Sequence, residues 1–299
     1  MIEFFTSLFQ GISLAHLNAL LILGLALFGG TIGGRLFQKL KIPQVVGYIA
    51  IGILIGQTGF SLVPPETVRQ FQPFSYFALG LISFMIGGEL KFTTLRKYGR
   101  QFFSILFMEA LGAFFFVGII VSIIAYLLLQ NPVQAVLTGL LLGSIAAATA
   151  PAATTDVLWE YRTRGPLTST VFGIVALDDI LALLLFAVSS SVATAFLGQG
   201  GGMAGELGNL AWEVGGALVI GGGSGFLLSQ LLKVFRDEDK TLTFGLGAIL
   251  LTLGLATTLK VDMLLSSMTM GILITNIAPR RSEEVFHLLR RVSTPIYVL

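Results

Sequence analysis

The chain has 299 residues, of which 55% are hydrophobic and 11% charged, and its formal net charge is +2. Soluble domains carry about 25% charged residues, so this composition excludes an ordinary soluble protein and predicts a chain that folds in lipid. The chain has no cysteine, which excludes disulfides, thiolate metal sites and cysteine nucleophiles. Its two histidines, His16 and His287, have no obvious acid or nucleophile beside them, so we expect neither an enzyme nor a bound cofactor.

Apolar stretches of membrane-spanning length recur along the whole chain. A spanning helix needs about 20 mostly apolar residues. Nine stretches meet this need, and they are residues 12–34, 42–58, 73–90, 101–128, 134–157, 165–196, 207–232, 241–258 and 261–278. A tenth begins at Ser293. These stretches predict an all-α polytopic membrane protein.

The connections between these stretches alternate in charge. The odd-numbered connections hold every lysine and arginine of the chain except Arg69 and Lys260. The positive-inside rule then places the odd connections in the cytoplasm. We therefore expect a multi-pass protein of the cell (inner) membrane with its N-terminus outside.

A short motif occurs twice, in stretches of opposite predicted direction. The letters GILI stand at residues 52–55 and again at 271–274. Opposite direction is what an inverted-topology repeat requires. On this interpretation the first repeat covers about residues 42–196 and the second begins near 261. An inverted repeat of this spacing would run roughly 110 residues beyond Leu299, so we expect residues 1–299 to be an incomplete transmembrane domain.

A proline lies deep in the stretch 134–157. Pro151 removes a backbone hydrogen bond there, which predicts a broken helix. Broken helices are tolerated at membrane depth where they line a cavity, and their freed backbone groups coordinate ions. Thr149 and the backbone of Ala150 would then supply oxygen ligands suited to a hard cation. The alternative is a simple proline kink.

Three acids lie near predicted cytoplasmic helix ends. Asp156 and Glu160 precede a basic loop, and Glu89 lies two residues before Lys91. One interpretation is a set of interfacial ion pairs with the neighbouring basic residues. The other is a cytoplasmic funnel that guides cations toward the membrane.

Two adjacent aspartates, Asp178 and Asp179, interrupt the apolar stretch 165–196. They lie about 21 Å along the helix from Arg164, near the bilayer centre. Each costs roughly 2.5–3.5 kcal/mol at that depth, so we expect a functional use. Neighbouring positions point about 100° apart on a helix, so one carboxylate faces a cavity and the other a neighbouring helix or a basic partner. The alternative is a pair capped by hydroxyls or a lysine that serves only packing.

Several motifs resemble the Kef-type and sodium/proton exchanger family of monovalent cation:proton antiporters. They are TAPAAT at 149–154, RTRGPLT at 162–168 and ALDD at 176–179, with IPQVVGY at 42–48 and FMIGGEL at 84–90. The resemblance implies an NhaA-like inverted-repeat fold of thirteen helices, two of which are broken and cross at mid-membrane. It also implies a homodimer that moves its core helices as an elevator.

The resemblance assigns roles to the acid pair. Asp179 matches the carboxylate that binds Na⁺ or K⁺ and H⁺, and Asp178 matches a preceding acid that pairs with a lysine of a late helix. The expected function is exchange of H⁺ for Na⁺ or K⁺ by alternating access. The partners are these ions and the lipid bilayer, with no nucleic acid, and a cytoplasmic regulatory domain would follow residue 299. The alternatives are a ligand-gated K⁺ efflux system that behaves like a channel and a non-transporting membrane sensor on the same fold.

Overall fold

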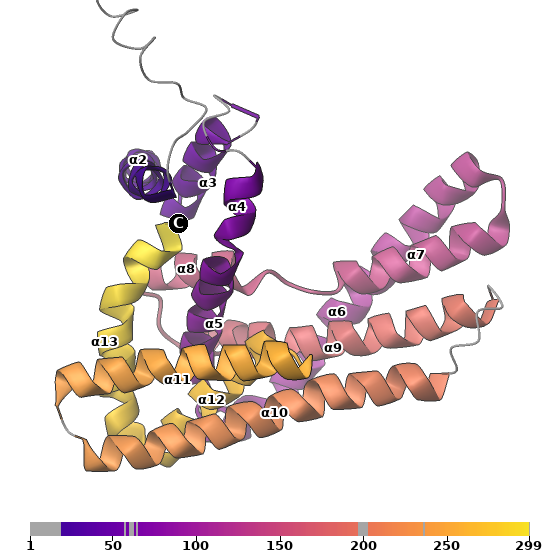
Figure 1. Cartoon of the computed structure of the whole chain (residues 1–299). Helices are drawn as coiled ribbons and strands as arrows, with labels where there is room; N and C mark the ends of the chain where they lie inside the picture. The colour runs from indigo at the N-terminus through magenta and orange to yellow at the C-terminus, as the bar shows by residue number, and fades with distance from the viewer. Residues whose placement is uncertain are drawn as a thin grey trace, which may run out of the picture. The chain divides into compact units, whose positions relative to one another are not determined.

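The structure is a computed structural model that describes residues 19–56, 58–59, 63, 65–196, 203–235 and 237–298. All regular elements in these residues are α-helices, which confirms the predicted class (Figure 1). The chain divides into two compact units, residues 1–78 with 291–299 and residues 79–290. The start of the first predicted span, at 12–18, lies outside the described residues.

The smaller unit contains a pair of helices that pack closely. These are α2 (Ala19–Lys39) and α3 (Gln44–Ile55), followed by the short α4 (Pro65–Gln70) and the first turns of α5 (Gln72–Glu89). A Cβ atom added at Gly47 would meet the backbone of Gly33. The two glycines therefore allow the backbones of α2 and α3 to touch, as small residues do between membrane helices.

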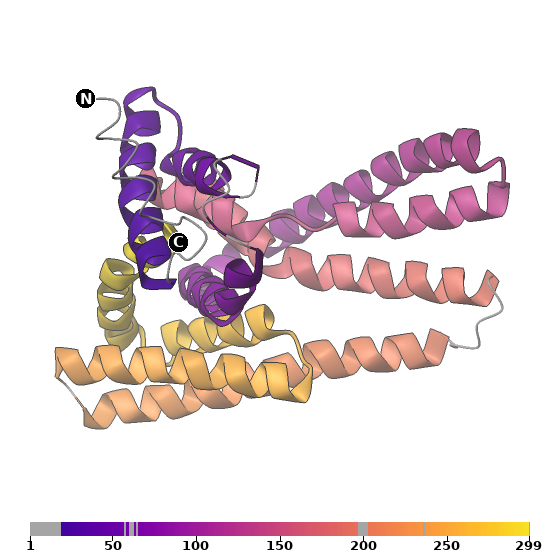
Figure 2. The same cartoon turned by 45° about the horizontal axis from the view of Figure 1, so that its top comes forward.

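A helical hairpin opens the larger unit. Its arms are α6 (Phe92–Leu129) and α7 (Pro132–Ala146), which lie side by side in both views (Figures 1 and 2). Asn131 caps α7, because its side-chain oxygen accepts the N–H groups of Val133 at 3.1 Å and Gln134 at 3.2 Å. Pro132 occupies the first position of α7, where the missing N–H costs nothing.

The chain breaks after α7 and resumes as a second, shorter helix. Residues 147–150 leave the helix, and α8 (Pro151–Glu160) begins at the proline. Pro151 lacks the N–H that would continue α7, and the preceding Ala150 has the extended backbone that proline favours. The break predicted from Pro151 is confirmed.

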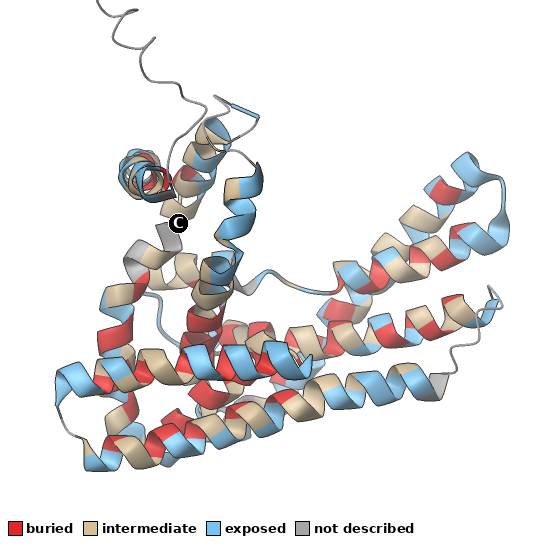
Figure 3. Ribbon diagram, viewed as in Figure 1, coloured by how far each residue is buried: buried red, intermediate tan, exposed pale blue. Residues whose placement is uncertain are grey.

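Five further helices complete the chain. They are α9 (Pro166–Phe196), α10 (Met203–Val234), α11 (Glu238–Leu259), α12 (Met263–Ile277) and α13 (Pro279–Val298). Within the larger unit α9 contacts α6, α7, α8 and α10, while α10 also contacts α11 and α12. Buried residues gather in the second half of α5 and in α9 and α12 (Figure 3).

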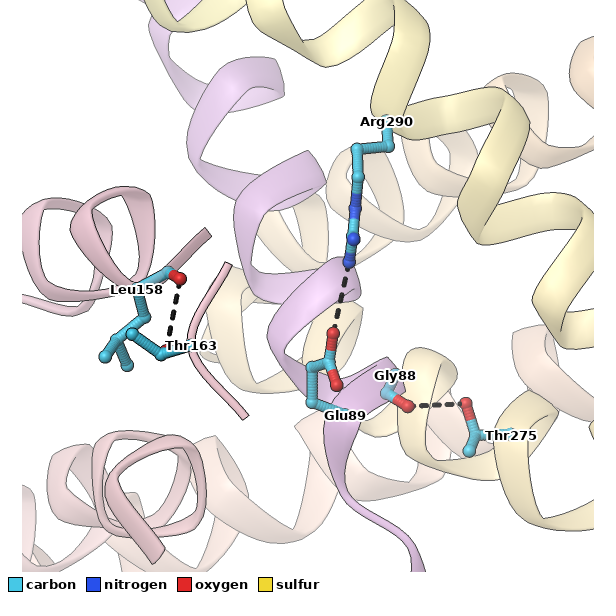
Figure 4. Close-up of polar contacts among 6 residues, drawn as sticks. All are labelled: Gly88, Glu89, Leu158, Thr163, Thr275 and Arg290. Carbon is cyan, nitrogen blue, oxygen red and sulfur yellow. Dashed lines mark hydrogen bonds and ion pairs between the residues drawn. The ribbon is translucent and has the colours of Figure 1, made fainter. Parts of the chain in front are cut away.

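Hydrogen bonds tie the end of α5 to α12. Ser267 Oγ donates to the carbonyl of Gly80 at 2.7 Å, and Thr275 Oγ1 donates to that of Gly88 at 3.0 Å (Figure 4). Asn276 donates to the Leu90 carbonyl at 2.9 Å. These bonds fix α12, whose first residue follows one of the site acids described below.

The predicted spans agree only in part with the helices. Among the described residues, five helices are long and apolar enough to cross a membrane: Leu20–Lys39, Gly99–Leu129, Pro166–Phe196, Gly205–Val234 and Glu238–Leu259. The predicted spans at 42–58, 73–90, 134–157 and 261–278 correspond to α3, α5, the α7–α8 pair and α12, which do not meet both criteria. Nine full spans and the inverted repeat therefore stay predictions.

A tenth membrane span beginning at Ser293 stays a prediction, because Ser293 lies inside the longer helix α13. The helix α13 begins at Pro279, so the basic segment expected as a loop is helical. Val285, Leu288 and Leu289 are buried, whereas Arg290 is exposed. This spacing gives one apolar stripe on a charged helix, which a search for wholly apolar stretches does not detect.

Candidate functional site

The buried carboxylate of Asp178 contacts the break between α7 and α8. Asp178 lies near the middle of α9, and its side chain is 0% exposed. One of its oxygens, Oδ2, accepts the backbone N–H of Thr149 at 2.6 Å. That N–H has lost the helical partner it would have in an unbroken α7, and the carboxyl oxygen of Asp178 replaces that partner.

The second oxygen of Asp178 completes an unusual environment. Asp178 Oδ1 is buried and has no hydrogen-bond partner among the described residues. A buried polar atom without a partner costs about 1–3 kcal/mol, so this oxygen is an unsatisfied acceptor beside the break. The alternative predicted from the sequence was a pair that serves only packing and is capped by hydroxyls or a lysine. In the described part of the chain, neither a hydroxyl nor a lysine caps Asp178 Oδ1.

A third carboxylate in an apolar helix contacts the break between α7 and α8, and the sequence reasoning missed it. Glu109 lies on α6, within the 31-residue apolar segment Gly99–Leu129. Its Oε1 accepts the hydroxyl of Thr149 at 3.1 Å. Thr149 therefore links Glu109 to Asp178, using its hydroxyl for one and its backbone for the other. The signal that could have revealed Glu109 is a lone acid in a long apolar run, the same signal that identified the aspartates.

Asp179 faces other acids. Its carboxyl is half-buried and lies within electrostatic range of Asp262 as well as Asp178. Asp262 caps α12, where its Oδ1 accepts the N–H of Leu265 at 2.6 Å. Glu213 on α10 is in turn within range of Asp262, and its carbonyl accepts the Asp262 N–H at 3.5 Å. The sequence reasoning missed Asp262 and Glu213, although an acid directly before an apolar run is a recognisable helix cap.

The two aspartates therefore have different surroundings, as the helix geometry predicted. Asp178 is joined to Thr149 beside the break, and Asp179 belongs to a line of carboxylates toward α10 and α12. The oxygen ligands expected from Thr149 and Ala150 thus adjoin Asp178 rather than Asp179. Among the described residues, no group of three or more His, Asp or Glu side chains could hold a metal ion.

The three acids assigned to helix ends have separate settings. Glu89 forms an ion pair with Arg290 of α13 at 3.1 Å, where the sequence had indicated Lys91 (Figure 4). Asp156 and Glu160 lie one turn apart on α8, close enough for their charges to repel. Within the described part of the chain Asp156 forms no ion pair, and both the interfacial-pair and the funnel interpretations of the three acids stay predictions.

Comparison with known families gives one match over most of the chain. Residues 23–297 match the family model described as "Sodium/hydrogen exchanger, transmembrane". A Na⁺/H⁺ antiporter of Enterococcus hirae is 32% identical over 176 residues, which are 58% of this chain and 43% of that protein. Na⁺/H⁺ antiporter 1 of Methanocaldococcus jannaschii is 28% identical over 241 residues, 78% of this chain and 53% of that protein. The chain therefore spans about half the length of these relatives.

Two further comparisons concern a longer alignment and a solved fold. The ammonium/H⁺ antiporter subunit AmhT of Alkalihalophilus pseudofirmus is 25% identical over 272 residues, 90% of this chain and 64% of that protein. A solved structure of the sodium proton antiporter MjNhaP1 from Methanocaldococcus jannaschii superposes with a TM-score of 0.72 at 20% identity. The superposition covers 93% of this chain and 66% of that chain, and it shows a shared fold.

Proposed function

The chain belongs to the sodium/hydrogen exchanger family, and we propose that it exchanges protons for a monovalent cation, Na⁺ or K⁺, across the cell membrane. The proposal includes alternating access and a homodimer in the inner membrane with its N-terminus outside. The likeness to an ammonium/H⁺ antiporter subunit adds NH₄⁺ to the cations worth assaying.

The observation that carries this proposal is the acid pair near the middle of α9, beside the break between α7 and α8. Each aspartate at mid-membrane costs roughly 2.5–3.5 kcal/mol, so the pair needs a use that outweighs its cost. Exchange is such a use, because one carboxylate can hold a proton or a cation in turn. Nothing in a purely structural role requires two adjacent acids.

We assign the exchanged ion to Asp179. Its side chain is half-buried, whereas Asp178 is fully buried, so a cation reaches Asp179 with less rearrangement. The charges of Asp262 and Glu213 extend from Asp179 toward α12 and α10. A row of like charges in a low-dielectric setting concentrates cations and repels anions.

Asp178 has a different task in this proposal. Its bond from the Thr149 N–H anchors the broken segment to α9, and bonds to an ionised acceptor are roughly twice as strong as neutral ones. A change of charge on the pair then alters how firmly Thr149, Ala150 and Pro151 are held. This coupling links ion occupancy on α9 to the position of the backbone oxygens at the break. Asp156 and Glu160 are proposed to guide cations at the far end of α8.

The test is ion exchange by the purified protein in proteoliposomes. An imposed proton gradient should drive uptake of ²²Na⁺, ⁸⁶Rb⁺ as a K⁺ tracer, or NH₄⁺, and uptake should dissipate the gradient. Asp179→Asn should abolish exchange, while Asp178→Asn should leave a reduced rate because its amide oxygen still accepts the Thr149 N–H. Full exchange by Asp179→Asn would refute the assignment of the ion to that residue.

The same vesicles separate the alternatives. A channel-like K⁺ efflux system would pass K⁺ down its gradient without moving protons in return. A sensor would bind a ligand and show neither flux. Coupled, saturable movement of both ions distinguishes the exchanger from both.

A further inference from the structure

A polar cavity of about 630 Å³ lies where α9 begins. Its walls come from the end of α8, the loop 162–165, the first two turns of α9, and single residues of α5 and α13. Ligand pockets for small molecules have volumes of about 300–1,000 Å³, so the cavity has a suitable size. It is distinct from the acid pair, because its lining residue nearest to the pair along α9 is Phe172, about 9 Å along the helix from Asp178.

The charge of the cavity is positive. Three arginines line it, Arg162, Arg164 and Arg290, against the single acid Glu89. Neither Arg162 nor Arg164 forms an ion pair with any described acid. This sign is wrong for a cation route through the cavity, so the cation guidance proposed above is given to Asp156 and Glu160, which do not line the cavity, and not to Glu89. It is the sign that an anionic ligand requires.

The walls of the cavity hold part of this charge in place. Arg290 reaches Glu89 at 3.1 Å (Figure 4), and its guanidinium carbon lies 5.5 Å from the ring centre of Trp159. Thr163 donates its hydroxyl to the Leu158 carbonyl at 3.1 Å (Figure 4), and this bond closes the loop that carries Arg162 and Arg164. Arg290 is thus held by its contacts with Glu89 and Trp159, and the other two arginines lie on a short loop that the Thr163 bond closes.

The first turn of α9 adds neutral donors. Thr168 and Ser169, which both carry hydroxyl groups, line the cavity. The opening N–H groups of a helix lack partners within the helix, and its N-terminal end carries partial positive charge. Guanidinium groups bind phosphate oxygens in pairs, and hydroxyl and amide donors supply the remaining contacts. The cavity therefore offers the set of groups that phosphate sites use.

We propose that this cavity binds a phosphate group with a free, doubly charged end, carried either by a small soluble molecule or by the headgroup of an anionic lipid. Arg162 and Arg164 grip the phosphate, Ser169 and the start of α9 orient it, and Arg290 supplies long-range attraction while it stays paired with Glu89. A bound phosphate joins the end of α8, the start of α9 and the middle of α13. It would thereby restrain α9, the helix that carries the acid pair, without touching the pair.

The experiment is phosphate binding to the purified full chain in detergent. Inorganic phosphate is titrated by calorimetry at constant ionic strength, with chloride as the balancing anion. Arg162→Gln/Arg164→Gln should weaken binding about tenfold or more, the loss expected for charge-assisted bonds. The matched control Arg96→Gln/Arg100→Gln removes the same charge from exposed positions on α6 and should leave the affinity unchanged.

Glu89→Gln should change the phosphate affinity in the opposite direction. It removes the acid of the cavity and releases Arg290, so phosphate should bind about two- to fivefold more tightly. Ser169→Ala should weaken binding with the net charge of the chain unchanged.

The source of the phosphate is distinguished in a second arm. The protein is incubated with phosphatidylcholine vesicles that contain a minority of phosphatidic acid. If the protein binds these vesicles through Arg162 and Arg164 but does not bind inorganic phosphate, the ligand is a lipid headgroup. If it binds inorganic phosphate but not the vesicles, the ligand is a soluble phosphate. The proposal is overturned if neither probe binds saturably, or if both double variants weaken binding equally. These readouts need no transport, so they fail or succeed independently of the exchange proposal.

Discussion

Adding one methyl group at Gly271 should loosen the crossing of α5 and α12. A Cβ atom there would meet the carbonyl oxygen of Phe84, closer than the 3.0 Å below which real Cβ atoms are essentially never found. The obstacle is backbone, so no side chain can rotate away. The bonds from Ser267 to Gly80 and from Thr275 to Gly88 lie on either side of the contact and resist separation of the helices.

The magnitude follows from these contacts. Overpacking of this kind costs about 1–3 kcal/mol, and strained hydrogen bonds add to it at about 0.5–1.5 kcal/mol each. Replacing a helical glycine by alanine returns roughly 0.5–1 kcal/mol. We therefore expect Gly271→Ala to lower the free energy of unfolding by about 1–5 kcal/mol.

Gly254 provides the matched control. It lies within α11, and a Cβ atom there would meet nothing within 4 Å. Gly254→Ala should therefore stabilise the protein by about 0.5–1 kcal/mol through helix propensity alone. Thermal unfolding of both variants in detergent measures the contrast. A Gly271→Ala protein as stable as Gly254→Ala would refute the close crossing.

Two further predictions concern the acids that the structure adds to the site. Asp262→Asn keeps an oxygen for the Leu265 N–H but removes the charge near Asp179, so it should lower the apparent cation affinity about two- to fivefold at unchanged stability. Asp262→Ala should in addition lower the free energy of unfolding by about 0.5–2 kcal/mol, because the helix cap is lost. Equal melting temperatures of the two variants would contradict this. Thr149→Val removes the hydroxyl donated to Glu109 and should slow exchange, whereas Thr149→Ser should restore it; identical rates for Val and Ser would show that this bond has no part in transport.

Local signals in the sequence determined much of this protein. Apolar runs predicted an all-helical membrane chain, because lipid selects helices whose backbone groups are satisfied internally. Pro151 marked the broken helix, because a residue without an N–H cannot continue a helix wherever the chain goes next. The aspartate pair was conspicuous because its cost depends on membrane depth, which residue counting along α9 supplies.

Contacts across the fold were decided by the tertiary structure alone. The 100° angle between Asp178 and Asp179 predicted different neighbours but not which neighbour each would have, since that depends on how α9 is rotated against α7, α8 and α12. Thr149 meets Asp178 over a separation of 29 residues and Glu109 over 40, and Arg290 meets Glu89 over 201. No periodicity in one helix encodes such pairs, because they arise only when packed helices bring distant segments together. The acid pair was therefore visible in the sequence, whereas the partners of each aspartate appeared only in the folded chain.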